Sequence, residues 1–344
     1  MFKGNGISKE QLTDTGEPCV LYGELYTKYK SEFISDIFSK TDIDTRKLVK
    51  SKANDVIIPC SGETAVDIAT ARCVPYDNIL LGGDLNIIRL YDCDGSFMSY
   101  QLNGKRKYDL AKVAQGVSVV HLYGDHLKGV KTYNPCLEEQ KKIAKLLSIL
   151  DERIATQNKI IDKLQSLIKG IAQKIVRNNK PNVRLSECLE CKSSTLQESE
   201  VCEQGTYPEY GANGIVGYLD NYSTEGEAIY IIKDGSGVGT VSYVEGKCSA
   251  TGTLNTLQAK EDYSLQYLYY LLKVFNFEPY KTGMAIPHIY FKDYGKAKVF
   301  CPSYIEQLRY ARLLSAIDNK LSAEQHLLTN LSLQKQYLLR QMFI

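Results

Sequence analysis

The residues best suited to chemistry lie in a segment that the chain contains twice. Residues 115–123 read QGVSVVHLY and residues 282–290 read TGMAIPHIY, so glycine, histidine and tyrosine occupy matching positions. A histidine can ligate a metal, transfer a proton or contact a ligand. The first copy has a further histidine nearby, His126, which has no counterpart in the second copy. We therefore predict a structural or contact role for His121 and His288 rather than a shared metal site.

Three cysteines that lie close together in sequence suggest a zinc site. A structural zinc is held by four ligands, normally supplied as two pairs. Cys188, Cys191 and Cys202 have neither a second pair nor a histidine near them. The chain has ten cysteines without regular spacing, and its first residues show no apolar leader, a pattern typical of reduced thiols in the cytoplasm. We predict no metal site and a cytoplasmic protein.

The glycines Gly235, Gly237 and Gly239 suggest a phosphate-binding loop. Such a loop leads into the N-terminus of a helix, where backbone N–H groups hold the phosphate. Here residues 240–244 alternate in the manner of a strand, so we predict a hairpin turn and no nucleotide site. No Ser-His-Asp arrangement, carboxylate pair or nuclease-like cluster stands out either. The sequence therefore predicts a chain with no catalytic residues and no cofactor of its own.

The repeat continues beyond the histidine segment and defines the elements that position it. The same offset, without a gap, joins a proline, a glutamate and a glutamine in each copy: Pro135, Glu139 and Gln140, and Pro302, Glu306 and Gln307. Solenoid repeats have periods of about 20–50 residues, and this period is much longer. The chain is therefore a duplicated domain with pseudo-twofold character, in the order globular unit, long helix, globular unit, long helix.

The two predicted helices carry a heptad pattern, because their apolar residues recur at alternating steps of four and three. Each helix has about 40 residues and is about 60 Å long, longer than a globular unit is wide. We predict that they pair as an antiparallel coiled coil; the alternative is that each packs only on its own domain. The seam positions are Leu147, Leu150, Ile154, Gln157, Ile161, Leu164, Leu314, Ile317, Leu321, Glu324, Leu328 and Leu331.

Both globular units are predicted to be mixed α/β (α+β) with short strands. The clearest strands are 55–59 and 228–233, and the clearest short helix is 265–273. The predicted domains are 1–134 and 179–301, with spacer helices at 135–178 and 302–344. Hydrophobic residues make up 44% of the chain, but no apolar run is long enough to span a membrane.

The repeated motifs resemble a known family. Residues 135–151 and 302–318 resemble the two conserved helical regions of specificity subunits of Type I restriction-modification systems. Residues 18–29 and 207–218 resemble the entries to their target recognition domains. The resemblance covers nearly the whole chain. It implies two target recognition domains, joined by two long helices that form the antiparallel coiled coil.

The same resemblance implies a function. Each recognition domain would read one half of a bipartite target in double-stranded DNA. The helices would set the spacing and dock two methyltransferase (modification) subunits, and restriction subunits would complete the complex. S-adenosylmethionine and the chemistry would reside on the partners. This chain would be non-catalytic within a complex that is a DNA adenine methyltransferase and endonuclease.

One departure from the family leaves alternatives open. Residues 183–192 open the second unit, and no counterpart of them precedes the first glycine loop of unit one. We therefore expect that a segment is missing before Met1. An inactive or recombined, truncated copy of a specificity subunit fits this departure. The residues alone also allow a protein-only coiled-coil scaffold or an enzyme that acts by itself.

The loops with side chains suited to DNA occur in both units. Base edges are read by hydrogen-bonding side chains, whereas lysines hold phosphates. The unit-one candidates are Tyr22, Lys28, Tyr29, Lys30, Ser61, Glu63, Thr64, Asn86, Lys105, Lys107 and Gln115. The unit-two candidates are Tyr207, Asn213, Lys233, Asp234, Ser236, Thr251, Thr253, Asn255, Lys281 and Thr282. Because the loops differ, we predict an asymmetric target, and the net charge of only +2 indicates that partner subunits supply much of the phosphate contact.

Overall fold

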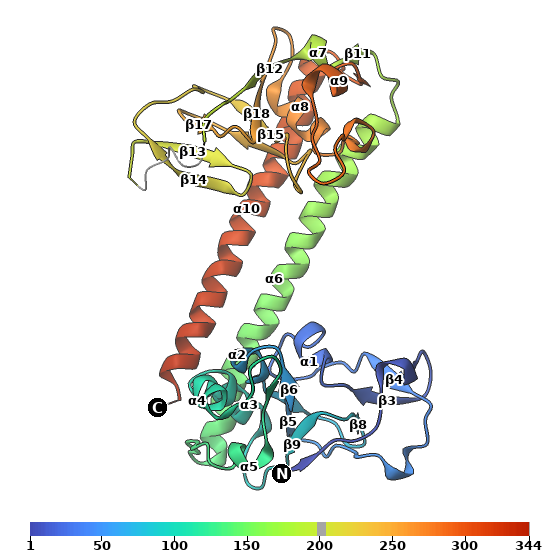
Figure 1. Cartoon of the computed structure of the whole chain (residues 1–344), viewed down its shortest axis with the longest axis vertical. Coiled ribbons are helices and arrows are strands. Elements are labelled where there is room, and N and C mark those ends of the chain that lie inside the picture. The colour runs from blue at the N-terminus through green and yellow to red at the C-terminus, as the bar shows by residue number, and fades with distance from the viewer. Residues whose placement is uncertain (198–203, 344) are drawn as a thin grey trace. The chain divides into compact units, whose positions relative to one another are not determined.

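The computed structural model describes residues 1–197 and 204–343. The chain divides into two compact units, unit 1 (Met1–Asn158 and His326–Ile344) and unit 2 (Lys159–Gln325). Two long helices, α6 (Leu137–Arg177) and α10 (Tyr304–Gln341), each contribute one part to unit 1 and one part to unit 2 (Figure 1). Within the described ranges, no helix is long and apolar enough to cross a membrane.

Unit 1 is built on a four-stranded antiparallel sheet. Its strands, in spatial order, are β1 (Phe2–Lys3), β9 (Leu85–Ile88), β5 (Asp55–Pro59) and β7 (Arg72–Val74). The predicted strand 55–59 is confirmed as β5, and all its residues are buried. Val56 and Ile58 pack on one side against the helices, and Ile57 packs on the other side with Val20, Leu25 and Leu81. The helices around it are α2 (Ala65–Ile68), α3 (Gly95–Asn103), α4 (Lys107–Val113) and α5 (Gly124–Leu127).

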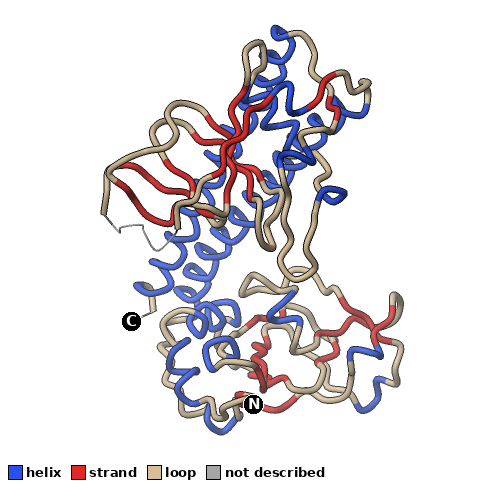
Figure 2. Tube along the Cα trace, turned by 45° about the horizontal axis from the view of Figure 1, so that its top comes forward, coloured by secondary structure: helices blue, strands red, loops and turns tan. Residues whose placement is uncertain are grey.

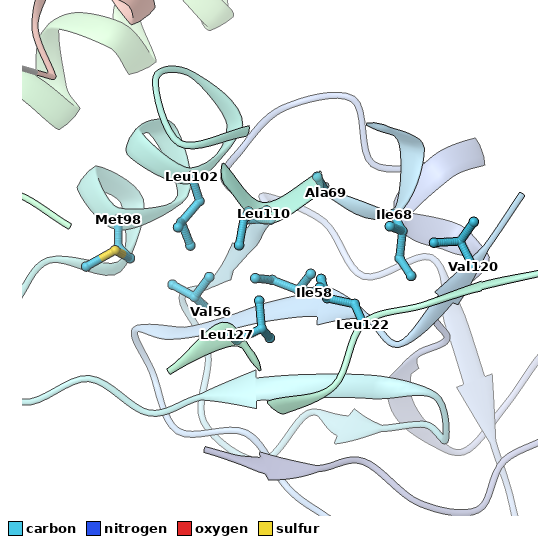
Figure 3. Packing of buried hydrophobic residues seen from close by; sticks show 11 residues of the cluster. Val56, Ile58, Ile68, Ala69, Met98, Leu102, Leu110, Val120, Leu122 and Leu127 are labelled. Carbon is cyan, nitrogen blue, oxygen red and sulfur yellow. The ribbon is translucent and has the colours of Figure 1, made fainter. Parts of the chain in front are cut away.

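The core of unit 1 lies between β5 and these helices. Val56 and Ile58 of β5 meet Leu102 of α3, Leu110 of α4 and Leu127 of α5 (Figure 3). Burial of side chains of this size stabilises a fold by about 1.5–3 kcal/mol each. The segment after α4 reaches this core through Leu122, which is fully buried. That anchor fixes the position of the histidine segment in unit 1.

A second sheet and several short elements complete unit 1 (Figure 2). The sheet has the order β2 (Leu12–Thr13), β4 (Ser39–Thr41), β3 (Glu17–Val20) and β8 (Leu80–Leu81). A separate two-stranded pair joins β6 (Ser61–Gly62) to β10 (Val120–His121). The short helices are η1 (Lys9–Gln11), α1 (Glu24–Thr27) and η2 (Thr45–Lys47).

Unit 2 repeats this plan. Its four-stranded sheet has the order β12 (Leu189–Ser193), β18 (Leu254–Ala259), β15 (Ala228–Ile232) and β16 (Val241–Val244). Its second sheet has the order β14 (Gly214–Leu219), β13 (Tyr207–Gly211) and β17 (Ser249–Ala250). The remaining elements are β11 (Val183–Arg184), α7 (Leu185–Cys188), α8 (Leu265–Leu272), η4 (Glu278–Tyr280), α9 (Phe291–Tyr294) and β19 (Lys298–Val299).

The pairing registers show that the units are two copies of one fold. Ile58 pairs with Asn86 across β5 and β9, and Ile231 pairs with Asn255 across β15 and β18. In both units the second sheet holds one parallel pair, β3 with β8 and β13 with β17. The predicted strand 228–233 and helix 265–273 are confirmed as β15 and α8. The glycine-rich loop 235–239 joins the antiparallel strands β15 and β16, so the predicted hairpin turn is confirmed.

The coiled-coil prediction is confirmed within unit 1, where α6 and α10 share a core. Leu147 and Leu150 of α6 cluster with Leu331 and Leu339 of α10. The helices run antiparallel here, because Leu331 lines a groove with Gln157, whereas the later Lys335 binds the earlier Asp151. The core also contains Phe97 and Tyr100 of α3, so the paired helices pack on the globular part of unit 1 too. The alternative, in which each helix packs only on its own domain, is wrong.

In unit 2 the beginning of α10 and the end of α6 lie under α8. Leu314, Ala172 and Ile175 line one small apolar cavity with Tyr267 and Tyr270. Taken over both units, each of the twelve predicted seam residues is buried or half-buried. The two polar seam residues, Gln157 and Glu324, are 5% and 8% exposed. The heptad pattern therefore correctly predicted the buried face of each helix.

Candidate nucleic-acid interface

A buried glutamine anchors each unit to its long helix. The side chain of Gln140 accepts a hydrogen bond from the backbone N–H of Asp94 at 2.8 Å and donates to the carbonyl of the proline that precedes the helix at 2.8 Å. Gln307 accepts from the N–H of Ser264 at 2.9 Å and donates to the equivalent proline carbonyl at 2.9 Å. Asp94 and Ser264 are the N-caps of α3 and α8. The glutamine of the repeated proline, glutamate and glutamine motif thus binds the N-terminus of a helix in each unit, and we call this arrangement a clamp.

A tyrosine and an aspartate make a second anchor. The hydroxyl of Tyr100 in α3 donates to Asp151 at 2.6 Å, and the hydroxyl of Tyr270 in α8 donates to Asp318 at 3.2 Å. Both aspartates belong to the repeated helical motif. Together with the glutamine clamps, these bonds fix α3 and α8, and the sheets that pack on them, to the long helices.

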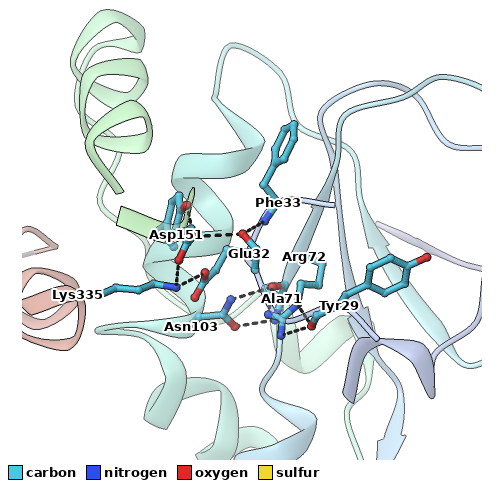
Figure 4. Close-up of polar contacts among 10 residues, drawn as sticks. Tyr29, Glu32, Phe33, Ala71, Arg72, Asn103, Asp151 and Lys335 are labelled. Atoms are coloured by element: carbon cyan, nitrogen blue, oxygen red, sulfur yellow. Dashed lines mark hydrogen bonds and ion pairs between the residues drawn. The ribbon is translucent and has the colours of Figure 1, made fainter. Parts of the chain in front are cut away.

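Unit 1 adds a buried charge cluster at its anchor (Figure 4). The ammonium of Lys335 lies 2.6 Å from a carboxylate oxygen of Glu32 and 2.6 Å from one of Asp151. Burial raises the pKa of Glu32, although the charge of Lys335 opposes that shift. Burial acts to lower the pKa of Lys335, but the two carboxylates outweigh it and raise that pKa. The lysine is therefore charged, and it links the segment before β4 to both helices.

The histidine segment of unit 1 forms one wall of an open cleft. His121 of β10 pairs with Ser61 of β6, and Ser61 and Glu63 line a cleft of about 750 Å³ with Tyr22 and Val119. The hydroxyl of Ser61 donates to Asp84. Burial raises the pKa of the Asp84 carboxyl, against the charges of His121 and Lys3. The structure thus gathers three predicted contact residues, Tyr22, Ser61 and Glu63, around one hollow.

The remaining unit-one candidates divide by exposure. Lys28, Lys30 and Gln115 are exposed beside the cleft elements, with Lys28 paired to Glu24 at 2.7 Å. Thr64 is exposed and caps α2 by accepting from the N–H of Asp67 at 3.1 Å.

Four other candidates in unit 1 lie elsewhere. Tyr29 is buried, and Asn86 is buried with its amide donating to the carbonyl of Leu122 at 2.8 Å. Lys105 lies in the turn between α3 and α4, and Lys107 is the first residue of α4; neither lines the cleft. Tyr29 and Asn86 therefore position the loops and do not offer a surface for direct contact.

Unit 2 has a cleft beside its own histidine segment, and its lining has different chemistry. A cleft of about 490 Å³ is lined by Lys233, Asp234, Asn255, His288 and Tyr290, among others. Asp234 pairs with His288 through the backbone, and its carboxylate lies 2.6 Å from the Nδ1 atom of that histidine. Because Ser61 pairs with His121 in the same way, Asp234 occupies the place that Ser61 has in unit 1.

The other unit-two candidates surround this cleft to different degrees. Thr253 accepts from the N–H of Lys233 through its carbonyl, Ser236 is exposed in the hairpin turn, and Thr282 pairs with His288. Thr251 and Asn255 are buried. Three candidates do not line this cleft. Lys281 binds Glu278 at 2.6 Å, and Tyr207 and Asn213 belong to the separate hairpin of β13 and β14.

Sequence reasoning missed the cations and rings beside the histidines. Lys3 lies over the ring of Tyr123 at 5.8 Å, and Lys292 lies over the ring of Tyr290 at 5.2 Å. Arg72 also lines the unit-one cleft. The repeat contained the two tyrosines, so comparison of its copies pointed to them. Lys3 lies on strand β1, outside the repeated stretch, and Lys292 of α9 has Asp125 as its counterpart in the first copy, so the repeat did not point to either lysine.

The cysteines do not gather into a cluster of metal ligands in the parts of the chain that the structure describes. Cys188 lies with its sulfur 3.8 Å from that of Cys301, and Cys191 is on strand β12. Cys202 lies outside the described residues. Across 1–197 and 204–343, no group of three or more His, Cys, Asp or Glu side chains is arranged to hold a metal ion.

The family model for the Type I restriction modification DNA specificity domain matches this chain twice, at residues 2–166 and 179–333. The chain therefore belongs to the family of type I specificity subunits, and the resemblance in the helical motifs and recognition-domain entries is confirmed. A type I specificity subunit of Mycoplasma genitalium is 24% identical over 283 residues, which cover 75% of this chain and 73% of that protein. The EcoprrI specificity subunit of Escherichia coli is 28% identical over 116 residues, which cover 34% of this chain and 29% of that one.

Solved structures share the fold. The crystal structure of a type I S subunit from M. genitalium superimposes with a TM-score of 0.70 at 21% identity, over 100% of this chain and 93% of that one. A chain from a structural study of complex assembly in the type I R-M system gives a TM-score of 0.55 at 16% identity, over 94% and 90% of the two chains. The predicted architecture of two recognition domains on two long helices is confirmed.

Proposed function

We propose that this chain is the DNA-recognition subunit of a type I restriction-modification complex in the cytoplasm, and that each unit reads one half of a bipartite target. The proposed recognition domains are residues 1–134 and 179–301, and the spacer helices are residues 135–178 and 302–344. One observation carries the proposal. The same histidine-strand wall is built in both units, but the polar group beside it is Ser61 with Asp84 in one and Asp234 in the other.

That difference is suited to the discrimination of bases. A serine hydroxyl can donate or accept a hydrogen bond, whereas an ionised aspartate only accepts. Asp234 is 34% exposed at its side chain, and only one of its carboxylate oxygens is bound to His288. Its other oxygen suits an amino group on a base edge, such as the cytosine N4 group. Two half-sites with different sequences follow from these two walls.

Lysines beside the clefts suit the phosphates. Lys233 and Lys292 line the unit-two cleft, and Lys28 and Lys30 are exposed in unit 1. Phosphate contacts set the register of a protein on the duplex and carry no sequence information. The net charge of +2 is low for a protein that would hold a long target alone. We propose that partner subunits supply the remaining phosphate contacts.

Exposed apolar residues of the long helices suit two copies of one partner. Leu146 and its repeat equivalent Leu313 are 45% and 50% exposed, and Ile160 and its equivalent Leu327 are 37% and 45% exposed. Exposed apolar residues that recur at equivalent positions indicate an interaction surface that is used twice. We propose that two methyltransferase subunits dock there and that the helices set their spacing. S-adenosylmethionine and the chemistry would reside on those subunits, and restriction subunits would join the assembly.

Co-expression with a methyltransferase subunit and mapping of methylated sites would test the proposal. The expected result is an asymmetric bipartite target, methylated only when both proteins are present. Exchange of residues 1–134 for the recognition domain of another specificity subunit should replace one half-site and retain the other. A purified complex that binds the mapped duplex no better than a scrambled one would contradict the proposal, and would favour a scaffold without DNA.

A further inference from the structure

The histidine segment contains a rigid loop that both units build in the same way. In unit 1 the backbones of Gln115 and His121 exchange two hydrogen bonds, of 2.9 and 2.6 Å. In unit 2 Thr282 and His288 exchange two, of 2.9 and 2.7 Å. The glycine after the first residue has a positive φ in both copies, 122° and 86°. A methyl group there would lie 2.1 or 2.4 Å from a carbonyl oxygen of the same loop, so only glycine fits.

The tips of the two loops carry apolar side chains that stand fully in solvent. Val117 is 98% exposed and Met284 is 106% exposed, at equivalent positions of the repeat. The exposure does not come from a loose segment, because Leu122 and Ile289, which follow the loops, are 0% and 1% exposed. Single exposed apolar residues are common on protein surfaces. The same exposed tip on the same constrained backbone, built twice, indicates a contact that both units make.

Because the two loops have the same backbone and the same kind of exposed tip, their contacts should be of the same kind in both units. The two units differ where they would read sequence, so a shared loop must meet something common to both half-sites. The shape and stacking of the duplex are common to both, and so is a partner subunit that is present in two copies. The position of the loops favours the duplex. Val119 lines the unit-one cleft with Ser61 and Glu63, and in unit 2 the carbonyl of Pro287 accepts from the N–H of Gly235 beside Asp234 at 2.9 Å.

We propose that Val117 and Met284 are apolar wedges, each of which enters the DNA of its own half-site and unstacks one base step. This inference rests on the proposed function. Apolar side chains are used in this way by proteins that kink or open a duplex. An aliphatic tip makes no hydrogen bond to a base edge, so the same device serves two different sequences. Tyr123 and Tyr290, 44% and 48% exposed, lie two residues after the histidines, at the N-caps of α5 and α9, and offer rings against the opened step.

The wedge gives the recognition subunit a part in the reaction of its partner. A methyltransferase must take its target base out of the stack, and that movement costs free energy. A step already unstacked by this chain lowers that cost in each half-site. The wedges should therefore affect the rate of methylation more than the affinity for DNA.

The test uses the assembled complex with its methyltransferase and a duplex of the mapped target, in which 2-aminopurine replaces one adenine of either half-site. Binding of the wild-type complex should raise the fluorescence of the probe in both halves. Met284→Ser should abolish the rise in the half-site read by unit 2 alone, and Val117→Ser in the other alone. We expect methylation of the affected half to slow about tenfold, with a change in Kd of less than about threefold.

Two controls make the outcomes distinguishable. Met284→Leu keeps an apolar tip and should keep the signal, and Leu333→Ser removes a side chain that is 58% exposed on α10 and should change nothing. A wild-type complex with no preference for the mapped duplex refutes the proposed function itself. Preference that persists with unchanged fluorescence in Met284→Ser refutes the wedge alone. Loss of methyltransferase from purified Met284→Ser also overturns the wedge, because the loop is then a protein contact.

Discussion

The residues that anchor each unit to its long helices have diverged less than the residues beside the histidine segments. Gln140 and Gln307 make the same two hydrogen bonds, and both units hold a tyrosine hydroxyl on an aspartate of the long helix. The walls differ, because Ser61 in one unit stands where Asp234 stands in the other. A duplicated recognition protein has to keep what holds a domain on its helix. It is free to change what the domain presents to its ligand.

The aspartate anchors also differ in their surroundings. Asp151 is 12% exposed at its side chain and shares Lys335 with Glu32, whereas Asp318 is 27% exposed and has Lys273 at 4.0 Å. The same anchor therefore sits in a buried ionic cluster in unit 1 and beside a half-exposed lysine in unit 2. Removal of the same kind of charge should have unequal consequences in the two units.

The largest expected effect comes from a charge in the helix seam. Leu147→Asp and Leu314→Asp each place a carboxylate at a position that is 0% or 1% exposed. We expect each to cost about 3–5 kcal/mol in the free energy of unfolding, because an unpaired charge is buried and a cavity is left. Denaturant unfolding of the full chain measures this. The matched controls Leu146→Asp and Leu313→Asp change the exposed neighbours and should stay within about 0.5 kcal/mol of wild type. Equal costs for seam and control would show that the seam is assigned wrongly.

The next effect contrasts the two aspartate anchors. Lys335→Met removes the cation between two buried carboxylates, and breaking a buried pair in this way costs about 3–5 kcal/mol. Lys273→Met removes a half-exposed cation 4.0 Å from Asp318 and should cost less than about 1 kcal/mol. The two unfolding midpoints compare the anchors directly. Similar losses would mean that the buried cluster adds nothing to unit 1.

The pH dependence of stability gives a second measurement of the same cluster. The pKa of Glu32 is higher in the folded chain than its ordinary value of 4.5. The folded state therefore binds more protons than the unfolded state between those two pKa values, and the contribution of Glu32 to stability falls as pH rises through that window. Glu32→Gln should remove this part of the pH dependence. Unfolding curves from pH 4 upward that coincide in shape for both proteins would contradict the shift.

The clamps should respond alike in the two units. Gln140→Ala and Gln307→Ala each leave a backbone N–H, part-buried at Asp94 and buried at Ser264, and a proline carbonyl without the partner they now have. We expect each to cost about 1–3 kcal/mol, because an unsatisfied buried group loses its hydration without compensation. Denaturant unfolding of both variants checks the equality. A difference larger than about 2 kcal/mol would break the view that the anchors are equivalent.

The parts of this structure that the sequence predicted are those with a local or periodic origin. The heptad spacing selected the buried faces of α6 and α10, and the alternation after Gly239 identified a hairpin. Such patterns did not predict which of the polar DNA-contact candidates would be buried. Asn86 and Asn255 suggest surface chemistry by type, but both are buried on inner strands of their sheets, where the Asn86 amide donates to the carbonyl of Leu122 and the Asn255 side chain accepts from Ser193.

Long-range pairing was equally hidden. Lys335 binds Glu32 although most of the chain separates them in sequence, and no rule of residue spacing predicts such a pair. The sequence placed Ser61 and Asp234 in matching loops but did not show that the two residues are equivalent. Their separation differs from the offset of the repeat because the intervening loops differ in length. The register of each strand against its histidine is what identifies them as equivalent.

The smallest expected effect concerns the walls and leaves stability unchanged. Asp234→Asn together with Ser236→Ala alters the unit-two wall and its turn, and a base-edge contact is worth about 1–3 kcal/mol of discrimination. We expect the half-site read by unit 2 to lose its preference while the other half and the spacer stay as they are. Ser61→Ala with Glu63→Ala should do the reverse. Lys233→Ala is the matched control, because loss of a phosphate contact should weaken all sequences alike and lower the salt slope by about one. Methylation-site mapping of each complex separates these outcomes. If either wall variant alters both halves at once, the two units do not read DNA independently, and the difference between Ser61 and Asp234 has another cause.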